Sequence, residues 1–209
     1  MIIIRIGMNI HSVIWKGVWN VSETKRDLIL DASLILFEKR GFDGTTVPMI
    51  VEKAGVGAGT LYRYFENKEA LVNSLFQKCM NELLDAMKNG YPHSSNDVRK
   101  QFHHLLNSVI TYSRDNRNAM LFLDAHANGY FLDEASRDAY KQFKEFLFAF
   151  IDQGKKKNII RQLPADALIA IVAGTFIALC KAFQDGEMTE TPELMVGIED
   201  ACWDAIRMN

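Results

Sequence analysis

The sequence predicts an all-α protein of about nine helices. Hydrophobic residues recur at helical spacing along the whole chain. No stretch shows the sustained apolar and polar alternation, bounded by turn residues, that a β-sheet requires. Helix start and stop signals divide the chain into segments of helical length. These three observations favour a helical fold from end to end.

Two helices are expected near the N-terminus. The first begins at Ser22 and ends at Gly41, which can take the left-handed conformation of a helix end. Its expected buried residues are Leu28, Ile29, Ala32, Ile35 and Leu36. The second runs from Thr45 or Thr46 to Ala54, with a proline in its first turn, where a missing N–H costs little.

Seven further helices are expected. A short one covers residues 58–65, and Asn67 caps a long one that reaches about Lys88. Glycine, proline and serine between residues 90 and 96 mark the next break. Asn158, which follows three lysines, is typical of a left-handed helix C-cap. The later helices are expected at 97–115, 118–128, 132–157, 165–185 and 192–208.

Composition excludes several classes of protein. A chain of 209 residues with 48% hydrophobic residues can bury a sizeable core, which excludes disordered and disulfide-rich small proteins. The three cysteines are far apart and show no metal-ligand spacing, so we expect buried free thiols, no metal and no cofactor. The first 68 residues hold nine Lys and Arg against seven Asp and Glu, which permits an anionic partner there.

The sequence predicts neither a membrane-spanning helix nor a signal peptide. The longest uncharged apolar stretch, Ala167–Cys180, has 14 residues, whereas a spanning helix needs roughly 18 or more. Residues 1–21 lack a compact apolar region followed by a cleavage site, so a signal peptide is not expected. We treat them as an extension that is either disordered or packed through its tryptophans. A cytoplasmic location follows from these expectations.

The segment from Thr45 to Phe65, TTVPMIVEKAGVGAGTLYRYF, carries the functional signal. Gly55 can take a positive φ at the end of one short helix, and Val56 then folds back onto Val51. The next helix starts two or three residues later. Two short helices joined by a tight glycine turn are typical of a helix-turn-helix, whose second helix enters the DNA major groove.

Helical geometry separates the two faces of the second helix. At 100° per residue, Leu61 and Phe65 share one face, and Arg63 lies opposite them. Tyr62 and Tyr64 stand on either side of Arg63. An arginine between two phenols suits contact with base edges and flanking phosphates.

A surface helix whose tyrosines only cover the core is the alternative interpretation. Gly57 and Gly59 weigh against it, because glycine destabilises a helix interior by about 1 kcal/mol and stability alone does not call for it. Glycine does allow a backbone to approach another molecule closely.

The segments GFDGTTVPMIVEK and AGVGAGTLYRYFENKEAL resemble the DNA-binding domain of TetR-type (tetracycline-repressor-like) transcriptional regulators over about residues 23–71. The resemblance implies a DNA-binding domain at residues 22–68 and a helical regulatory and dimerisation domain at 69–209. It implies phosphate contacts from Thr45 or Thr46, Tyr62, Tyr64 and Lys68, and groove contacts from Thr60 and Arg63. The full set expected at the DNA is Thr45, Thr46, Gly57, Ala58, Gly59, Thr60, Tyr62, Arg63, Tyr64 and Lys68.

Two positions depart from the family pattern. Gly57 stands where Ser or Thr usually caps the recognition helix, and Ala58 stands where a polar residue is common. Both departures remove side-chain contacts, which implies weaker binding or a different operator sequence. The alternative is that the backbone N–H groups still meet the phosphate and binding is unaffected.

The C-terminal region holds nine of the 13 phenylalanines, enough to fill a core or line a cavity. The resemblance implies a small effector among the middle helices. We expect an apolar or aromatic molecule with a histidine or tyrosine as its polar anchor. The candidate wall is His103, Tyr112, Phe122, His126, Phe146 and Phe176.

The helix expected at 165–185 is apolar on almost every side, so it must be buried on every side. One side can face the core and the other a second subunit. With the last helix it predicts a two-fold homodimer interface, which the resemblance also implies. The expected contacts are Ile169, Val172, Ile177, Leu194, Ile198 and Cys202.

The sequence therefore predicts a ligand-responsive regulator that binds a palindromic double-stranded operator as a homodimer, with half-sites about 34–36 Å or a multiple apart. The resemblance implies that this regulator is a repressor. Two rivals stay open. One is a DNA-binding regulator without a ligand, and the other is an all-helical enzyme or carrier of hydrophobic ligands. No nucleophile motif, phosphate loop or metal spacing supports an enzyme.

Overall fold

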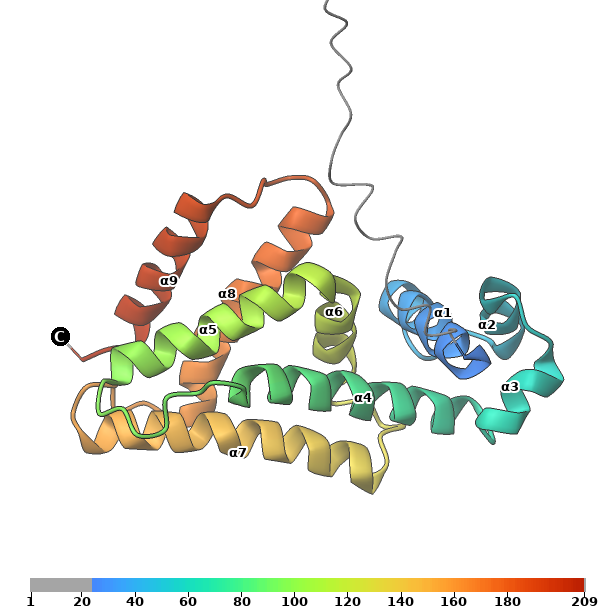
Figure 1. Ribbon diagram of the computed structural model, residues 1–209, viewed down its shortest axis with the longest axis horizontal. Coiled ribbons are helices and arrows are strands. Elements are labelled where there is room, and N and C mark those ends of the chain that lie inside the picture. Colours follow the sequence, from blue (N-terminus) through green and yellow to red (C-terminus); the bar gives the residue numbers. More distant parts are fainter. Residues whose placement is uncertain (1–23, 209) are drawn as a thin grey trace, which may run out of the picture.

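The computed structural model describes residues 24–208, and over this range the chain forms nine α-helices and no strand (Figure 1). The prediction of an all-α fold is confirmed, and each predicted helix is present with ends shifted by a few residues. The helices are α1 (Lys25–Arg40), α2 (Val47–Ala54), α3 (Ala58–Tyr64), α4 (Lys68–Lys88), α5 (Val98–Asp115), α6 (Arg117–His126), α7 (Glu134–Lys156), α8 (Ala165–Gln184) and α9 (Pro192–Ile206).

Local caps explain where several helices begin. The expected start at Ser22 lies outside the described residues, and α1 is capped instead by Thr24. The Thr24 hydroxyl accepts a hydrogen bond from the Asp27 backbone N–H, and the Asp27 carboxylate accepts one from the Thr24 N–H. Asn67 caps α4 as predicted, through a 2.7 Å bond from the Ala70 N–H to its side-chain oxygen.

The buried face of α1 differs from the prediction. Ile29 and Ala32 are buried as expected, but Leu28, Ile35 and Leu36 are only partly buried. Packing against α2, α3 and α4 on one side and α6 on another rotates the buried stripe. The residues actually enclosed are Ile29, Leu30, Ala32, Ser33 and Phe37.

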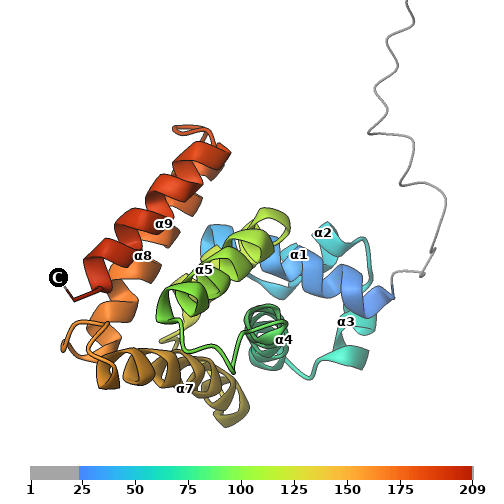
Figure 2. The same cartoon turned by 60° about the vertical axis from the view of Figure 1, so that its left-hand side comes forward.

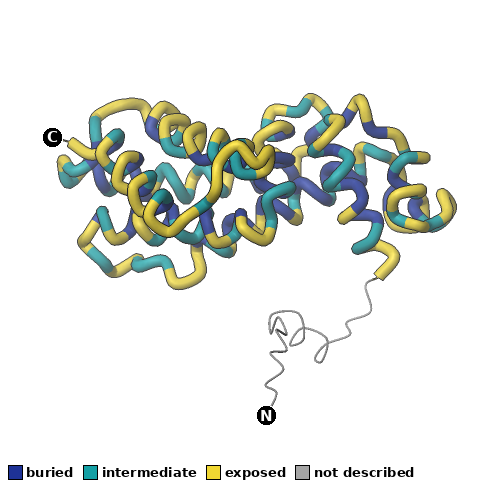
Figure 3. The backbone as a smooth tube through the Cα atoms, turned by 90° about the horizontal axis from the view of Figure 1, so that it is seen from above, coloured by how far each residue is buried: buried dark blue, intermediate teal, exposed yellow. Residues whose placement is uncertain are grey.

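The helices form two regions joined by α4. Helices α1 to α3 pack together at one end of the molecule, and α5 to α9 build the body at the other (Figures 1 and 2). Helix α4 runs from the small end into the body and lies along α7. Buried residues run through both regions without interruption (Figure 3). The core therefore links the two ends mechanically.

Helix α8 is unlike the others in composition. Among the described helices, α8 alone has both the length and the apolar composition of a membrane-spanning helix. Only 17% of its most apolar 18-residue window is buried. The 14-residue count from the sequence underestimated it, because Asp166 and Lys181 lie at the ends of the helix. A largely apolar helix with one exposed side needs a further partner for that side.

His126 lies in the aromatic contact between α1 and α6. Its ring is 4.6 Å from that of Phe122 and 6.4 Å from that of Phe37. Nδ1 donates to the Phe122 carbonyl at 2.8 Å, while Nε2 is buried without a hydrogen-bond partner among the described residues. Burial lowers the pKa of His126 below its ordinary value of 6.5, and the bond to Phe122 only partly opposes this.

Acid pH is expected to destabilise the fold through His126. Because the folded state binds this proton less readily than the unfolded chain, the free energy of unfolding should fall as pH drops through about 6.5, by about 1.4 kcal/mol for each unit of pKa depression. Urea unfolding at pH 7.5 and 5.5 measures the difference. His126→Asn, which keeps a donor and does not titrate, should flatten the dependence. An unaltered slope in His126→Asn would contradict the assignment.

Candidate nucleic-acid interface and effector cavity

Helices α2 and α3 are joined by the tight turn that the sequence predicts. Gly55 has φ 64° and ψ 34°, the left-handed conformation. The Gly55 N–H points to the carbonyls of Glu52 and Val51, and the Val56 N–H donates to the Val51 carbonyl at 3.0 Å. The turn satisfies the free carbonyls at the end of α2 and sets the direction in which α3 leaves.

Helix α3 has a buried back and an exposed polar front. Leu61 is fully buried and Phe65, just after the helix, is 5% exposed. Tyr62 and Tyr64 are 54% and 41% exposed, and Arg63 between them is also exposed. The predicted faces are therefore confirmed, and the arginine and both phenols point away from the protein.

The glycines at the start of α3 are not required by internal packing. Gly57 caps the helix with φ −77° and ψ 151°, a conformation open to any residue, and makes no side-chain cap bond. A Cβ atom built on Gly57 or Gly59 would meet no atom within 4 Å. Their small size leaves room for something outside the protein.

Of the two threonines expected at phosphate, Thr45 is excluded by its burial. Its side chain is fully buried, and its hydroxyl lies 2.8 Å from the Gly41 carbonyl and 3.1 Å from the Leu36 carbonyl. Thr45 therefore ties the end of α1 to the start of α2. Thr46, at the N-cap of α2, is exposed and makes no side-chain cap bond.

Lys68 is held mainly by the protein itself. Its ammonium donates to the carbonyls of Phe42 at 2.8 Å and Thr45 at 3.0 Å, and lies 4.0 Å from the centre of the Phe42 ring. Two of its three N–H donors are occupied, so one is left for a phosphate. The sequence prediction missed this structural role.

The loop between α6 and α7 attaches the body to the end formed by α1 to α3. The Tyr130 hydroxyl donates to Asp43 at 2.7 Å, and the Phe131 ring stacks on Phe42 at 4.2 Å. Asn73 of α4 donates to the Phe131 carbonyl at 2.9 Å, and its side-chain oxygen accepts from the Asp133 N–H at 2.9 Å. None of these residues has a local sequence signal, because the contacts join positions 58 to 89 residues apart.

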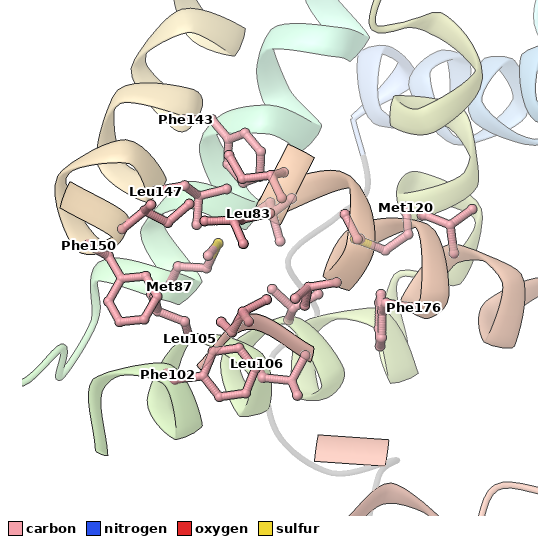
Figure 4. A pocket seen from close by; sticks show the side chains of 18 residues that line it. Leu83, Met87, Phe102, Leu105, Leu106, Met120, Phe143, Leu147, Phe150 and Phe176 are labelled. Atoms are coloured by element: carbon pink, nitrogen blue, oxygen red, sulfur yellow. The ribbon is translucent and has the colours of Figure 1, made fainter. Parts of the chain in front are cut away.

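An apolar cavity of about 140 Å³ lies in the body (Figure 4). Phe143 and Phe150 stand on one side of it, and Met120 and Phe176 on the other. Every lining side chain is apolar. The lining residues are Leu83, Met87, Phe102, Leu105, Leu106, Val109, Met120, Phe143, Leu147, Phe150, Ile151, Leu168, Ile169, Val172, Ala173, Phe176, Ile177 and Ile206.

Only Phe176 of the six expected effector contacts lines this cavity. Phe122 is fully buried in the core beside Phe37 and Phe76, 6.3 Å from each ring. His126 belongs to the same aromatic contact, so both residues support the junction of α1 and α6 rather than the cavity.

The other three expected contacts have different partners. His103 pairs with the buried Glu199 of α9 at 2.8 Å. Tyr112 points to Glu82 at 3.4 Å, and the Phe146 ring packs on Tyr91 at 5.2 Å. This cavity therefore holds neither a histidine nor a tyrosine, since helical spacing does not say which neighbour a ring meets. His103 and Tyr112 instead line a separate, more polar groove beside α5.

The expected dimer contacts lie on the inner side of α8 and α9. Ile169, Val172 and Ile177 line the cavity, Cys202 is buried, and Leu194 and Ile198 are partly buried. Many exposed positions of these two helices hold small or apolar residues. They include Ala167, Ala170, Ile171, Ala173, Gly174 and Ala178 of α8 with Val196, Gly197 and Ala201 of α9.

Two family models cover most of the chain. Residues 29–75 match the bacterial regulatory proteins of the tetR family, and residues 76–208 match the tetracyclin repressor-like C-terminal domain. The models meet inside α4.

Individual relatives agree with these models. The HTH-type transcriptional regulator YhgD of Bacillus subtilis is 22% identical over 165 residues, which cover 76% of this chain and 84% of that protein. A TetR family transcription regulator from Shewanella superposes with a TM-score of 0.72 at 26% identity, covering 89% of this chain and all of the other. FadR of Bacillus subtilis in complex with stearoyl-CoA superposes with a TM-score of 0.64 at 18% identity, covering 85% and 95%. With its exposed Arg63 front and a family match over most of its length, the chain belongs to the TetR family of DNA-binding transcriptional regulators.

Proposed function

We propose that this protein is a cytoplasmic repressor that binds a palindromic operator as a homodimer and is released by a small effector. The exposed front of α3 carries the proposal, because an arginine flanked by two phenols stands on a helix whose back is fully buried. The groove contacts are assigned to Thr60 and Arg63. Phosphate contacts are assigned to Thr46, Tyr62, Tyr64 and the free donor of Lys68.

The same face assigns a role to the glycines of α3. Gly57, Ala58 and Gly59 present backbone rather than long side chains, so the start of the helix can lie close to the DNA. We assign residues 22–68 to DNA binding and 69–209 to regulation and dimerisation, with α4 as the shared element.

The exposed face of α8 and α9 is proposed as the homodimer interface. Small residues such as Gly174 and Gly197 let helices of two protomers approach closely, and a Cβ on either would meet nothing within 4 Å in one protomer. A two-fold partner covers the apolar side of α8 and presents two α3 helices to one side of a duplex. In this assembly the partner subunit buries the apolar side of α8, so the composition of α8 does not require a membrane.

The apolar cavity favours an effector over a regulator without a ligand, since its all-apolar wall is a surface that a ligand can cover. Met120 links the cavity to the DNA-binding end through α6, whose last turn carries His126 against α1. The α6 to α7 loop then contacts Phe42 and Asp43. An occupant that displaces α6 therefore changes the position of α3, and linkage requires DNA to weaken effector binding equally.

Arg63→Ala should weaken binding to an operator, selected from random-sequence DNA, by about 1–3 kcal/mol per half-site. Random duplex DNA should lose much less affinity, because Arg63 is assigned to base edges. Gel-shift titrations at two salt concentrations measure both, with Lys141→Ala on the exposed side of α7 as the control. Equal losses on both DNAs would make Arg63 a phosphate contact.

Gly59→Ala should have opposite effects on stability and on DNA binding. Alanine favours a helix over glycine by about 1 kcal/mol, and the free protein has room for the methyl group, so the melting temperature should rise. Operator affinity should fall, because the methyl group meets the DNA. Calorimetry and gel shift on the same preparation test this, and unchanged affinity would argue against close approach at Gly59.

Ile171→Arg should convert the dimer to a monomer and weaken operator binding. Ile171 is 39% exposed in one protomer, and a charge there is buried without a partner in the proposed interface. Sedimentation velocity measures the assembly. Leu163→Arg, at an exposed position between α7 and α8, is the matched control and should stay dimeric. A dimeric Ile171→Arg protein would place the interface elsewhere.

A further inference from the structure

We propose that the effector is a compact, uncharged hydrocarbon-like molecule held without any hydrogen bond or ion pair. This inference rests on the proposed function, because it specifies the ligand of the same cavity. It replaces the expectation of a histidine or tyrosine anchor.

The chemistry of the wall carries the proposal. All 18 lining side chains are Leu, Ile, Val, Ala, Phe or Met, with no side-chain nitrogen or oxygen. The histidines and the tyrosine nearest in sequence to the lining residues of α5 are turned elsewhere, His103 to Glu199, His104 to the Met87 carbonyl and Tyr112 to Glu82. The lining backbone lies within helices, where its N–H and C=O groups are already paired. A polar group on a ligand would find no partner there.

The cavity is partly open at the surface, where Ala173 of its wall is exposed, and its inner space suits a small ligand. A volume of about 140 Å³ is close to that of an apolar protein cavity of about 150 Å³ that stays dry and takes up benzene or xenon. A single ring or a short branched alkane is therefore the matching scale.

The wall penalises a charged analogue of the same shape. A carboxylate placed there loses its hydration and meets no cation. The free energy lost in this way is far larger than the free energy gained by burying the ring. Met87 and Met120 adapt their unbranched side chains to the outline of a ligand. The cavity thus selects against charge and is tolerant of small differences in shape.

The experiment uses toluene and benzoate on the full chain. The two probes share a ring and differ by a methyl group against a carboxylate. Toluene at about millimolar concentration should raise the melting temperature by a few degrees, as ligand linkage requires, and should reduce operator affinity at least several-fold. Benzoate at the same concentration should change neither quantity.

Cavity-filling variants test the location. Val109→Phe and Val172→Phe each add a ring to the wall and should abolish the toluene shift. Leu163→Phe adds similar bulk at an exposed position outside the cavity and should keep the full shift. If one filling variant does not fold, the other and the pair of probes on the unaltered protein still decide the matter.

Three results would overturn the inference: a benzoate shift equal to that of toluene, no toluene shift, or a toluene shift that survives both filling variants. Its failure is separate from that of the proposed function. Operator binding without any probe tests the repressor assignment, and a protein that binds its operator but ignores toluene refutes only this ligand class.

Discussion

Burial of Leu61 and Phe65 beneath α3 is the interaction on which the DNA-binding surface depends. Seven residues are too few for a stable isolated helix, so α3 exists because its apolar back is enclosed by the core. Arg26 of α1 reinforces this contact: its guanidinium lies 5.4 Å from the Phe65 ring and donates to Ser74 of α4 at 2.8 Å. With the back held, the front can present Arg63 in one orientation.

The same aromatic core extends from the DNA-binding end into the body. Phe37 and Phe42 of the small region meet Phe122, His126 and Phe131 of the body. Rings packed in this way transmit displacement, because close-packed interiors are poorly compressible. The α6 to α7 loop adds polar bonds to the same junction. A change in the cavity therefore has a continuous packed route to α3.

Helix α8 shows how one apolar helix serves two surfaces. Most of its large apolar side chains line the cavity or the core, whereas many of its exposed positions hold Ala or Gly, with Ile171 as a large exposed exception. Both faces are apolar. In the proposed dimer, α8 contributes to both the cavity and the interface. A shift of α8 on effector binding therefore also changes how the two subunits are arranged.

The sequence by itself determined the helices of the described residues, the Asn67 cap of α4, the left-handed turns at Gly55 and Asn158, and the exposed front of α3. These features depend on residues within about one or two helical turns of each other, where spacing is sufficient information. Tertiary structure alone decided that Thr45 is enclosed, that Lys68 binds backbone carbonyls, and that five of the six expected effector contacts lie away from the cavity. Such outcomes depend on which other helix or loop, many tens of residues away, packs against a given side chain. The helical spacing of apolar residues is the same whichever partner that is.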